Sequence, residues 1–200
     1  MPIGVIVNGA NGRVGREMLG GLAGHSDLHL LAGVDSSASG DWLALASGCS
    51  IPTAPDLEAV IGDIRPLVVV DFSSAQGAMV AARTCLPLGV NLVIGTTGLS
   101  VEDVKEIGEL SANHGVGAVV AANFALGAVV MIHLAQIAAR YFDYAEITEM
   151  HHHLKADAPS GTALATARAM AEARGQPFQK APVEKHTLHG TRGGEVEGIA

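Results

Sequence analysis

Short apolar runs alternate with helix-like patterns through the first 121 residues of the chain. The runs are mostly apolar, and the first is followed by Gly9, which is typical of strands buried in a parallel sheet. We expect strands at 3–8, 28–34, 67–72, 91–94 and 116–121, and helices at 12–23, 57–61, 75–86 and 101–113, the last with Ser100 as its N-cap. A helical turn is expected at 41–46, before a loop interrupted by Pro52 and Pro55. This alternation predicts an α/β fold with a Rossmann-type parallel sheet and helices on both faces.

The pattern changes at Asn123. A long apolar helix (125–141) precedes a strand (144–150), a helix (160–174) and an irregular stretch rich in glycine and charge. We therefore place a domain boundary there, with a dinucleotide-binding domain at 1–123 and an α+β domain at 124–200. Because an apolar strand starts at Gly198–Ala200, we expect the second domain to be incomplete at its C-terminus.

Composition narrows the class of protein. A hydrophobic content of 48% in 200 residues is enough for one sizeable core and a smaller lobe. The net charge of −8 argues against nucleic-acid binding, so an anionic ligand must be held by local donors. No secretory signal begins the chain, and its most apolar helix is too short to span a membrane. The isolated Cys49 and Cys85 fit the reducing cytoplasm.

A glycine-rich turn joins the first strand to the first helix. Gly9-Ala10-Asn11-Gly12-Arg13-Val14-Gly15 would let a pyrophosphate approach the backbone and the helix N-terminus. Asp35 ends the next strand, at the spacing of an acidic residue that binds ribose hydroxyls; the alternative is an aspartate that caps a turn. Ser36 and Ser37 follow without an arginine for a 2′-phosphate. NADH is therefore the expected cofactor, and NADPH stays possible through Arg13.

Two further turns follow strands, at the edge where open α/β sheets bind ligands. Their small and hydroxyl side chains would let the nicotinamide end of a cofactor approach the backbone. They are Gly95-Thr96-Thr97-Gly98 and Ala121-Ala122-Asn123-Phe124, and Phe72-Ser73-Ser74 is a weaker candidate of the same kind. The alternative for each is an ordinary strand–helix loop.

The most informative segment is 149–163, Glu-Met-His-His-His-Leu-Lys-Ala-Asp-Ala-Pro-Ser-Gly-Thr-Ala. His151 and His153 face the same side of an extended strand, which is also a spacing of metal ligands. A metal site is disfavoured because no cysteine is near and Asp157 is the only carboxylate that follows closely. An inconsequential surface cluster is the other alternative. We favour proton transfer by histidine, with Lys155 and the N-terminus of a helix capped by Ser160 binding an anion.

These motifs together resemble the 4-hydroxy-tetrahydrodipicolinate reductase (dihydrodipicolinate reductase) family, along nearly the whole chain. The resemblance implies an N-terminal Rossmann domain and a C-terminal domain for substrate and subunit contacts. It implies that His151 donates the proton, that Lys155 is a second donor, and that His152, Gly161 and Thr162 bind the substrate carboxylates. Residues implied to line the cofactor are Gly9, Ala10, Asn11, Gly12, Arg13, Val14, Asp35, Gly95, Thr96, Thr97, Ala121, Ala122, Asn123 and Phe124.

The activity implied by the resemblance is NAD(P)H-dependent reduction of 4-hydroxy-tetrahydrodipicolinate to tetrahydrodipicolinate, in diaminopimelate and lysine biosynthesis. It implies a small dicarboxylate substrate and a homo-oligomer, a tetramer in the family. Ser36 departs from the family, which often has arginine there, and the family continues beyond residue 200. Two alternatives stay open: another NAD-dependent dehydrogenase, such as one acting on aspartate, and a nucleotide- or metal-binding protein without turnover.

Overall fold

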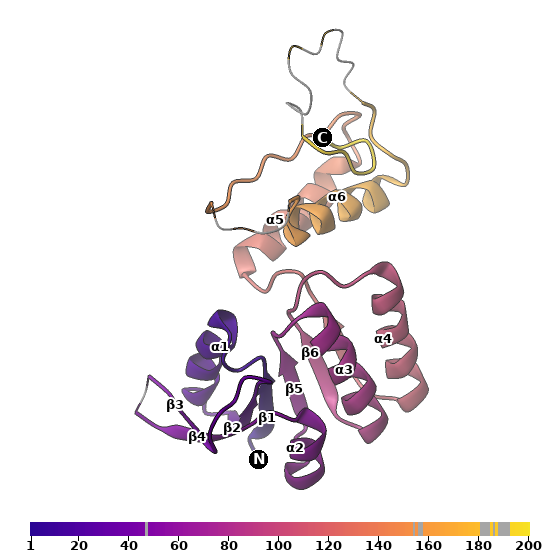
Figure 1. Ribbon diagram of the computed structural model, residues 1–200. Coiled ribbons are helices and arrows are strands. Elements are labelled where there is room, and N and C mark those ends of the chain that lie inside the picture. The colour runs from indigo at the N-terminus through magenta and orange to yellow at the C-terminus, as the bar shows by residue number, and fades with distance from the viewer. Residues whose placement is uncertain (47, 154, 156–157, 181–184, 186, 188–192) are drawn as a thin grey trace. The chain divides into compact units, whose positions relative to one another are not determined.

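The chain forms two units, residues 1–121 and 122–200, in the computed structural model (Figure 1). The structure describes residues 1–46, 48–153, 155, 158–180, 185, 187 and 193–200. Within them, none of the helices has the length and apolar character that crossing a bilayer requires.

The first unit is built on a seven-stranded sheet with the order β3-β4-β2-β1-β5-β6-β7. Its strands are β1 (Ile3–Asn8), β2 (Leu28–Val34), β3 (Trp42–Ala44), β4 (Ser50–Ala54), β5 (Val68–Asp71), β6 (Asn91–Ile94) and β7 (Ala118–Val120). All pairs are parallel except β3–β4. The strand order reverses at β1, which lies between β2 and β5. In open α/β sheets, ligands bind outside the carboxyl ends of the strands at such a switch point.

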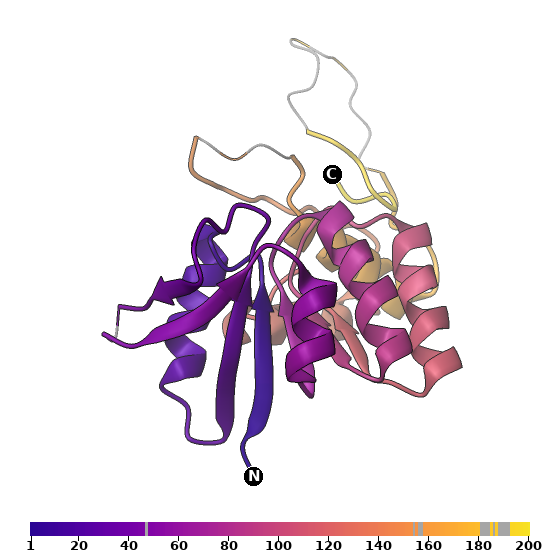
Figure 2. The same cartoon turned by 60° about the horizontal axis from the view of Figure 1, so that its bottom comes forward.

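Helices cover both faces of this sheet, as predicted (Figures 1 and 2). They are α1 (Arg13–Ala23), α2 (Leu57–Ile64), α3 (Ala75–Cys85) and α4 (Val101–His114), with a short 3₁₀ helix at Leu86–Leu88. Successive residues of β1 serve opposite faces, because side chains alternate along a strand. Fully buried Ile6 packs with residues of α2, α3 and α4, whereas Val7 packs with Leu19 of α1. The expected α/β architecture is confirmed.

The segment before α2 corrects the prediction. The helical turn expected at 41–46 is wrong, because Trp42–Ala44 forms an antiparallel hairpin with Ser50–Ala54. Pro52 is tolerated because β4 pairs with β2 only at Thr53 and Ala54, so the missing N–H of Pro52 falls outside that ladder. Ile51 of this hairpin is buried against the α1 side of the core. Burial therefore overrides the local turn signals.

The second unit contains α5 (Leu126–Ala139) and α6 (Gly161–Arg174), which pack against each other. Ala139, Ala167, Phe178 and Ile199 form its buried cluster. The strand expected at Tyr144–Met150 is wrong: the structure assigns no strand to these described residues. A strand exists only through its ladder, and here the Ile147 N–H donates to the carbonyl of Ala200 at 3.0 Å without a continuing register. The strand expected to start at 198 is an isolated bridge between Val196 and Ile199.

Candidate functional site

A cavity of about 670 Å³ lies at the carboxyl ends of the first unit's central strands. Its lining includes Gly9 and Gly12 of the glycine-rich turn, Asp35 at the end of β2, and the turn Phe72-Ser73-Ser74 after β5. Three segments that the sequence singled out separately therefore meet at one place. The Phe72–Ser74 turn, the weakest candidate in the sequence, is part of this lining.

The glycines of the first turn bring backbone close to backbone. Gly9 has a φ of +83°, and a Cβ there would lie 2.6 Å from the carbonyl oxygen of Phe72. A Cβ at Gly15 would lie 2.0 Å from the carbonyl oxygen of Gly9, so the first turn of α1 packs directly on the loop. Helix α1 is described completely, and it has neither a side-chain cap nor an acidic residue in its first turn. Its free N–H groups and positive dipole end suit a phosphate.

Asp35 is held as a carboxylate beside this turn. Its oxygens accept hydrogen bonds from the Asn11 N–H at 3.0 Å, the Ser37 N–H at 2.9 Å and the Ser37 hydroxyl at 2.6 Å. Burial raises the pKa of Asp35, but the hydrogen bonds from Ser37 and Asn11, with the nearby charge of Arg16, outweigh burial and lower it. The carboxylate therefore binds the glycine-rich turn to the end of β2.

The turn after β6 is connected to this region through a residue that the sequence reasoning missed. Thr96 is 8% exposed, and its hydroxyl donates to Oδ1 of the fully buried Asp71 at 2.6 Å. An acidic residue that ends an apolar strand was the signal for Asp35. The same signal is present in Val68-Val69-Val70-Asp71 and would have found Asp71.

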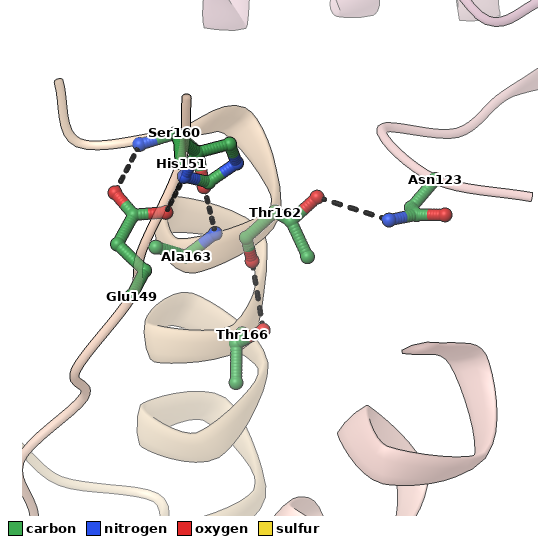
Figure 3. A network of polar contacts seen from close by, with 7 residues as sticks. All are labelled: Asn123, Glu149, His151, Ser160, Thr162, Ala163 and Thr166. Atoms are coloured by element: carbon green, nitrogen blue, oxygen red, sulfur yellow. Dashed lines mark hydrogen bonds and ion pairs between the residues drawn. The ribbon is translucent and has the colours of Figure 1, made fainter. Parts of the chain in front are cut away.

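In the second unit, a polar network surrounds Glu149 (Figure 3). Its Oε1 accepts the backbone N–H of Ser160 at 2.7 Å, and its Oε2 lies 3.5 Å from Nδ1 of His151. Hydrogen bonding by Ser160, first through its side chain and then through its backbone, lowers the pKa of Glu149 despite desolvation. The nearby charges of His151 and Lys155 lower it further. The Glu149 carboxylate thus contacts both His151, the predicted proton donor, and the start of α6.

The N-terminus of α6 is capped as predicted. The Ser160 side chain accepts the Ala163 N–H at 3.0 Å, which leaves Gly161 and Thr162 at the first two helical positions, where N–H groups have no intrahelical acceptor. The Thr162 hydroxyl accepts from Nδ2 of Asn123 at 3.3 Å (Figure 3). A predicted cofactor residue and a predicted substrate residue, 39 positions apart, are therefore in contact.

The remaining predicted residues of this segment lie close along the chain. His152 is exposed, and its carbonyl accepts the Lys155 N–H at 3.1 Å. Leu154, Ala156 and Asp157 fall outside the described residues. The described residues contain no group of three or more histidine, cysteine, aspartate or glutamate side chains arranged to hold a metal.

Comparison with known proteins assigns both units to the same family. Models of the dihydrodipicolinate reductase N-terminus and C-terminus match residues 3–124 and 127–200. Proteins named 4-hydroxy-tetrahydrodipicolinate reductase from Dehalococcoides mccartyi and Moorella thermoacetica are 46% and 45% identical, over 99% of this chain and 75% of theirs. A dipicolinate-bound dihydrodipicolinate reductase from Paenisporosarcina sp. TG-14 has a TM-score of 0.77 at 38% identity, covering 100% of this chain and 77% of that one.

Proposed function

This chain belongs to the dihydrodipicolinate reductase family, and from that premise we propose how its residues divide the work. The reaction is the NAD(P)H-dependent reduction of 4-hydroxy-tetrahydrodipicolinate in diaminopimelate and lysine biosynthesis. Residues 1–123 bind the dinucleotide, and residues 124–200 bind the substrate and supply the proton. We place the protein in the cytoplasm. We also propose that it forms a homo-oligomer, which light scattering in solution tests.

The first unit holds most of the cofactor. The turn Gly9–Val14 and the N-terminus of α1 bind the pyrophosphate, and Asp35 accepts the ribose hydroxyls. The cavity of about 670 Å³, which Gly9, Gly12 and Asp35 line, supports this placement. Gly95, Thr96 and Thr97 also contact the cofactor, Thr96 through its backbone because its hydroxyl donates to Asp71. Ala121, Ala122, Asn123 and Phe124 complete the nicotinamide end. When bound, the reduced nicotinamide supplies the hydride.

NADH is the preferred cofactor in this proposal. A 2′-phosphate is often bound by an arginine that directly follows the acidic residue, and here Ser36 and Ser37 stand at those positions. Ser37 donates twice to Asp35, which keeps a carboxylate where the extra phosphate would have to lie. The Asp35 carboxylate and a 2′-phosphate placed beside it repel each other, so NADPH binds more weakly than NADH.

The second unit carries the proton and the substrate charge. His151 protonates the substrate as hydride arrives, Lys155 is the second donor, and His152, Gly161 and Thr162 bind the carboxylates. The observation that carries this part is the Glu149 carboxylate, which bonds the N-terminus of α6 through Ser160 and lies 3.5 Å from His151. By facing Nδ1, Glu149 orients the imidazole and leaves Nε2 for the substrate, the role of an orienting carboxylate in other acid–base sites.

The test is the oxidation of NADH and of NADPH by this chain with freshly made heterocyclic substrate. His151→Gln should lower turnover about 10²- to 10⁴-fold, the usual contribution of a general acid, while NADH affinity is unchanged. His153→Gln, from the same segment, is the matched control and should retain turnover. Unchanged turnover in His151→Gln would remove the role assigned to this residue. Faster oxidation of NADPH than of NADH would overturn the cofactor preference.

A further inference from the structure

Asp71, the last residue of β5, is a carboxylate with no solvent exposure. Its Oδ2 accepts Nδ2 of Asn8 at 2.5 Å, and its Oδ1 accepts the Thr96 hydroxyl at 2.6 Å. Ser73 donates its N–H to Oδ1 at 3.2 Å and places its hydroxyl 3.0 and 3.1 Å from the two oxygens. Both oxygens are therefore satisfied by neutral donors.

The donors belong to three different strand ends. Asn8 ends β1, Ser73 lies in the turn after β5, and Thr96 lies in the turn after β6. Asn8 and Ser73 line the cavity of about 670 Å³, whereas Asp71 lies beneath them. One carboxylate is thus the common acceptor for three loops that converge on the carboxyl edge of the sheet.

Packing alone does not explain a carboxylate at this position. Val69 and Val70, the two residues before it, are apolar and buried, and an unexposed carboxylate without a cation costs free energy unless it is fully hydrogen-bonded. The charge of Asp71 also affects a buried thiol. The pKa of Cys85 is raised to about 12, mainly by burial and secondly by the charge of Asp71. An acceptor with four well-placed donors rigidifies whatever it connects.

We propose that Asp71 is a positioning residue for the dinucleotide: it holds Asn8, Ser73 and Thr96 so that the three loops are spaced for the cofactor before it binds. The residue does not touch the cofactor and acts through its three partners. Pre-organisation of this kind raises affinity because the loops need not be ordered when the ligand arrives. The inference rests on the family's use of NAD(P)H and is independent of the role proposed for His151.

The test compares NADH affinity, measured by fluorescence titration, with the unfolding midpoint of the nucleotide-free protein. Asp71→Asn puts an amide donor against the amide donor of Asn8, and the Kd for NADH should rise about tenfold, as for the loss of one hydrogen bond to a charged group. Asp103→Asn is the matched control: this aspartate bonds Ser100 at the start of α4, so its replacement should lower the midpoint and leave the Kd unchanged.

A second pair of variants tests Thr96, one of the residues that donate to Asp71. Thr96→Val removes one donor to Asp71 at nearly constant volume and should weaken NADH binding, whereas Thr96→Ser keeps the hydroxyl and should retain it. In a double-mutant cycle, Asp71→Asn and Thr96→Val should be less than additive in their effect on the Kd, since both disturb the one hydrogen-bond network that is centred on Asp71.

The proposal is overturned if Asp71→Asn lowers the unfolding midpoint but binds NADH as tightly as the parent chain, because Asp71 would then serve stability alone. If Asp71→Asn does not fold, the comparison of Thr96→Val with Thr96→Ser tests the proposal. Equal NADH affinity in Thr96→Val and Thr96→Ser would overturn the proposal, and weaker affinity in Thr96→Val alone would support it.

Discussion

At the scale of single residues, the chain uses carboxylates to connect segments that are apart in the sequence. Asp35 joins β2 to the glycine-rich turn, Asp71 joins three strand ends, and Glu149 joins His151 to the start of α6. Each accepts hydrogen bonds from residues distant in sequence. A carboxylate suits this task because it is an acceptor only and can receive several donors at once.

Glu149 gives a prediction about pH. Its pKa is lowered, first by the side-chain hydrogen bond of Ser160, so the stability it contributes is present above its ordinary value of 4.5 and is lost as pH falls through the lowered value in the folded protein. Near neutral pH, Glu149→Gln should lower the melting midpoint by roughly 2 to 4 °C, the shift a protein of this size shows when it loses one modest interaction. In acid below that lowered value, the difference should disappear.

The measurement is a series of thermal scans of the parent and variant across this pH range. Glu17→Gln, at an exposed position of α1, is the control and should show little difference at any pH. A difference between Glu149→Gln and the parent that persists unchanged into acid would contradict the assignment, because a protonated Glu149 can no longer accept as a carboxylate.

At the scale of elements, α4 shows how local bonds define a helix start. The Ser100 side chain accepts the Asp103 N–H at 3.0 Å, and the Asp103 carboxylate accepts the Ser100 N–H at 2.8 Å, a reciprocal capping box. Arg83 of α3 then binds Glu106 of α4 with two contacts, at 2.6 and 2.8 Å. The cap bonds backbone N–H groups that the helix leaves without acceptors, so it is the contact that defines where α4 starts.

Ser100→Ala should therefore lower the free energy of unfolding by about 1 kcal/mol, the typical value for loss of an N-cap. Urea denaturation followed by circular dichroism measures this. Ser100→Asp keeps a capping oxygen and should stay close to the parent. If both variants lose the same amount, the capping bond is not the source of the stabilisation.

At the scale of the whole molecule, the two units divide the proposed ligands between them. NADH should slow hydrogen exchange in the segments around 9–15 and 72–74, and a heterocyclic dicarboxylate should slow it around 149–163. At a ligand concentration 100 times the Kd, exchange through unfolding of the binding unit should slow about 100-fold. Hydrogen exchange with mass spectrometry measures each segment in one experiment. NADH that protected 149–163 but not 9–15 would contradict the division.

Much of this molecule was predictable because its signals are local. Apolar runs, glycine turns and caps depend on neighbouring residues. For this reason β1, β2 and β6, the caps at Ser100 and Ser160, and the α/β class could all be predicted without the structure. The family resemblance also rested on short contiguous motifs. These features need no knowledge of strand order.

The three-dimensional arrangement was needed to find the β3–β4 hairpin, the absence of a strand at 144–150, and the contacts of Asp71 and Glu149. A strand forms only where a partner strand pairs with it. Pro52 therefore indicates a loop in the sequence, and its place in a strand becomes clear only from the pairing of β3 with β4. Asn8 and Asp71 are 63 residues apart, and Thr96 lies 25 beyond Asp71. Their meeting follows from the order β1-β5-β6, in which all three strands end at one edge, and no local pattern encodes that order.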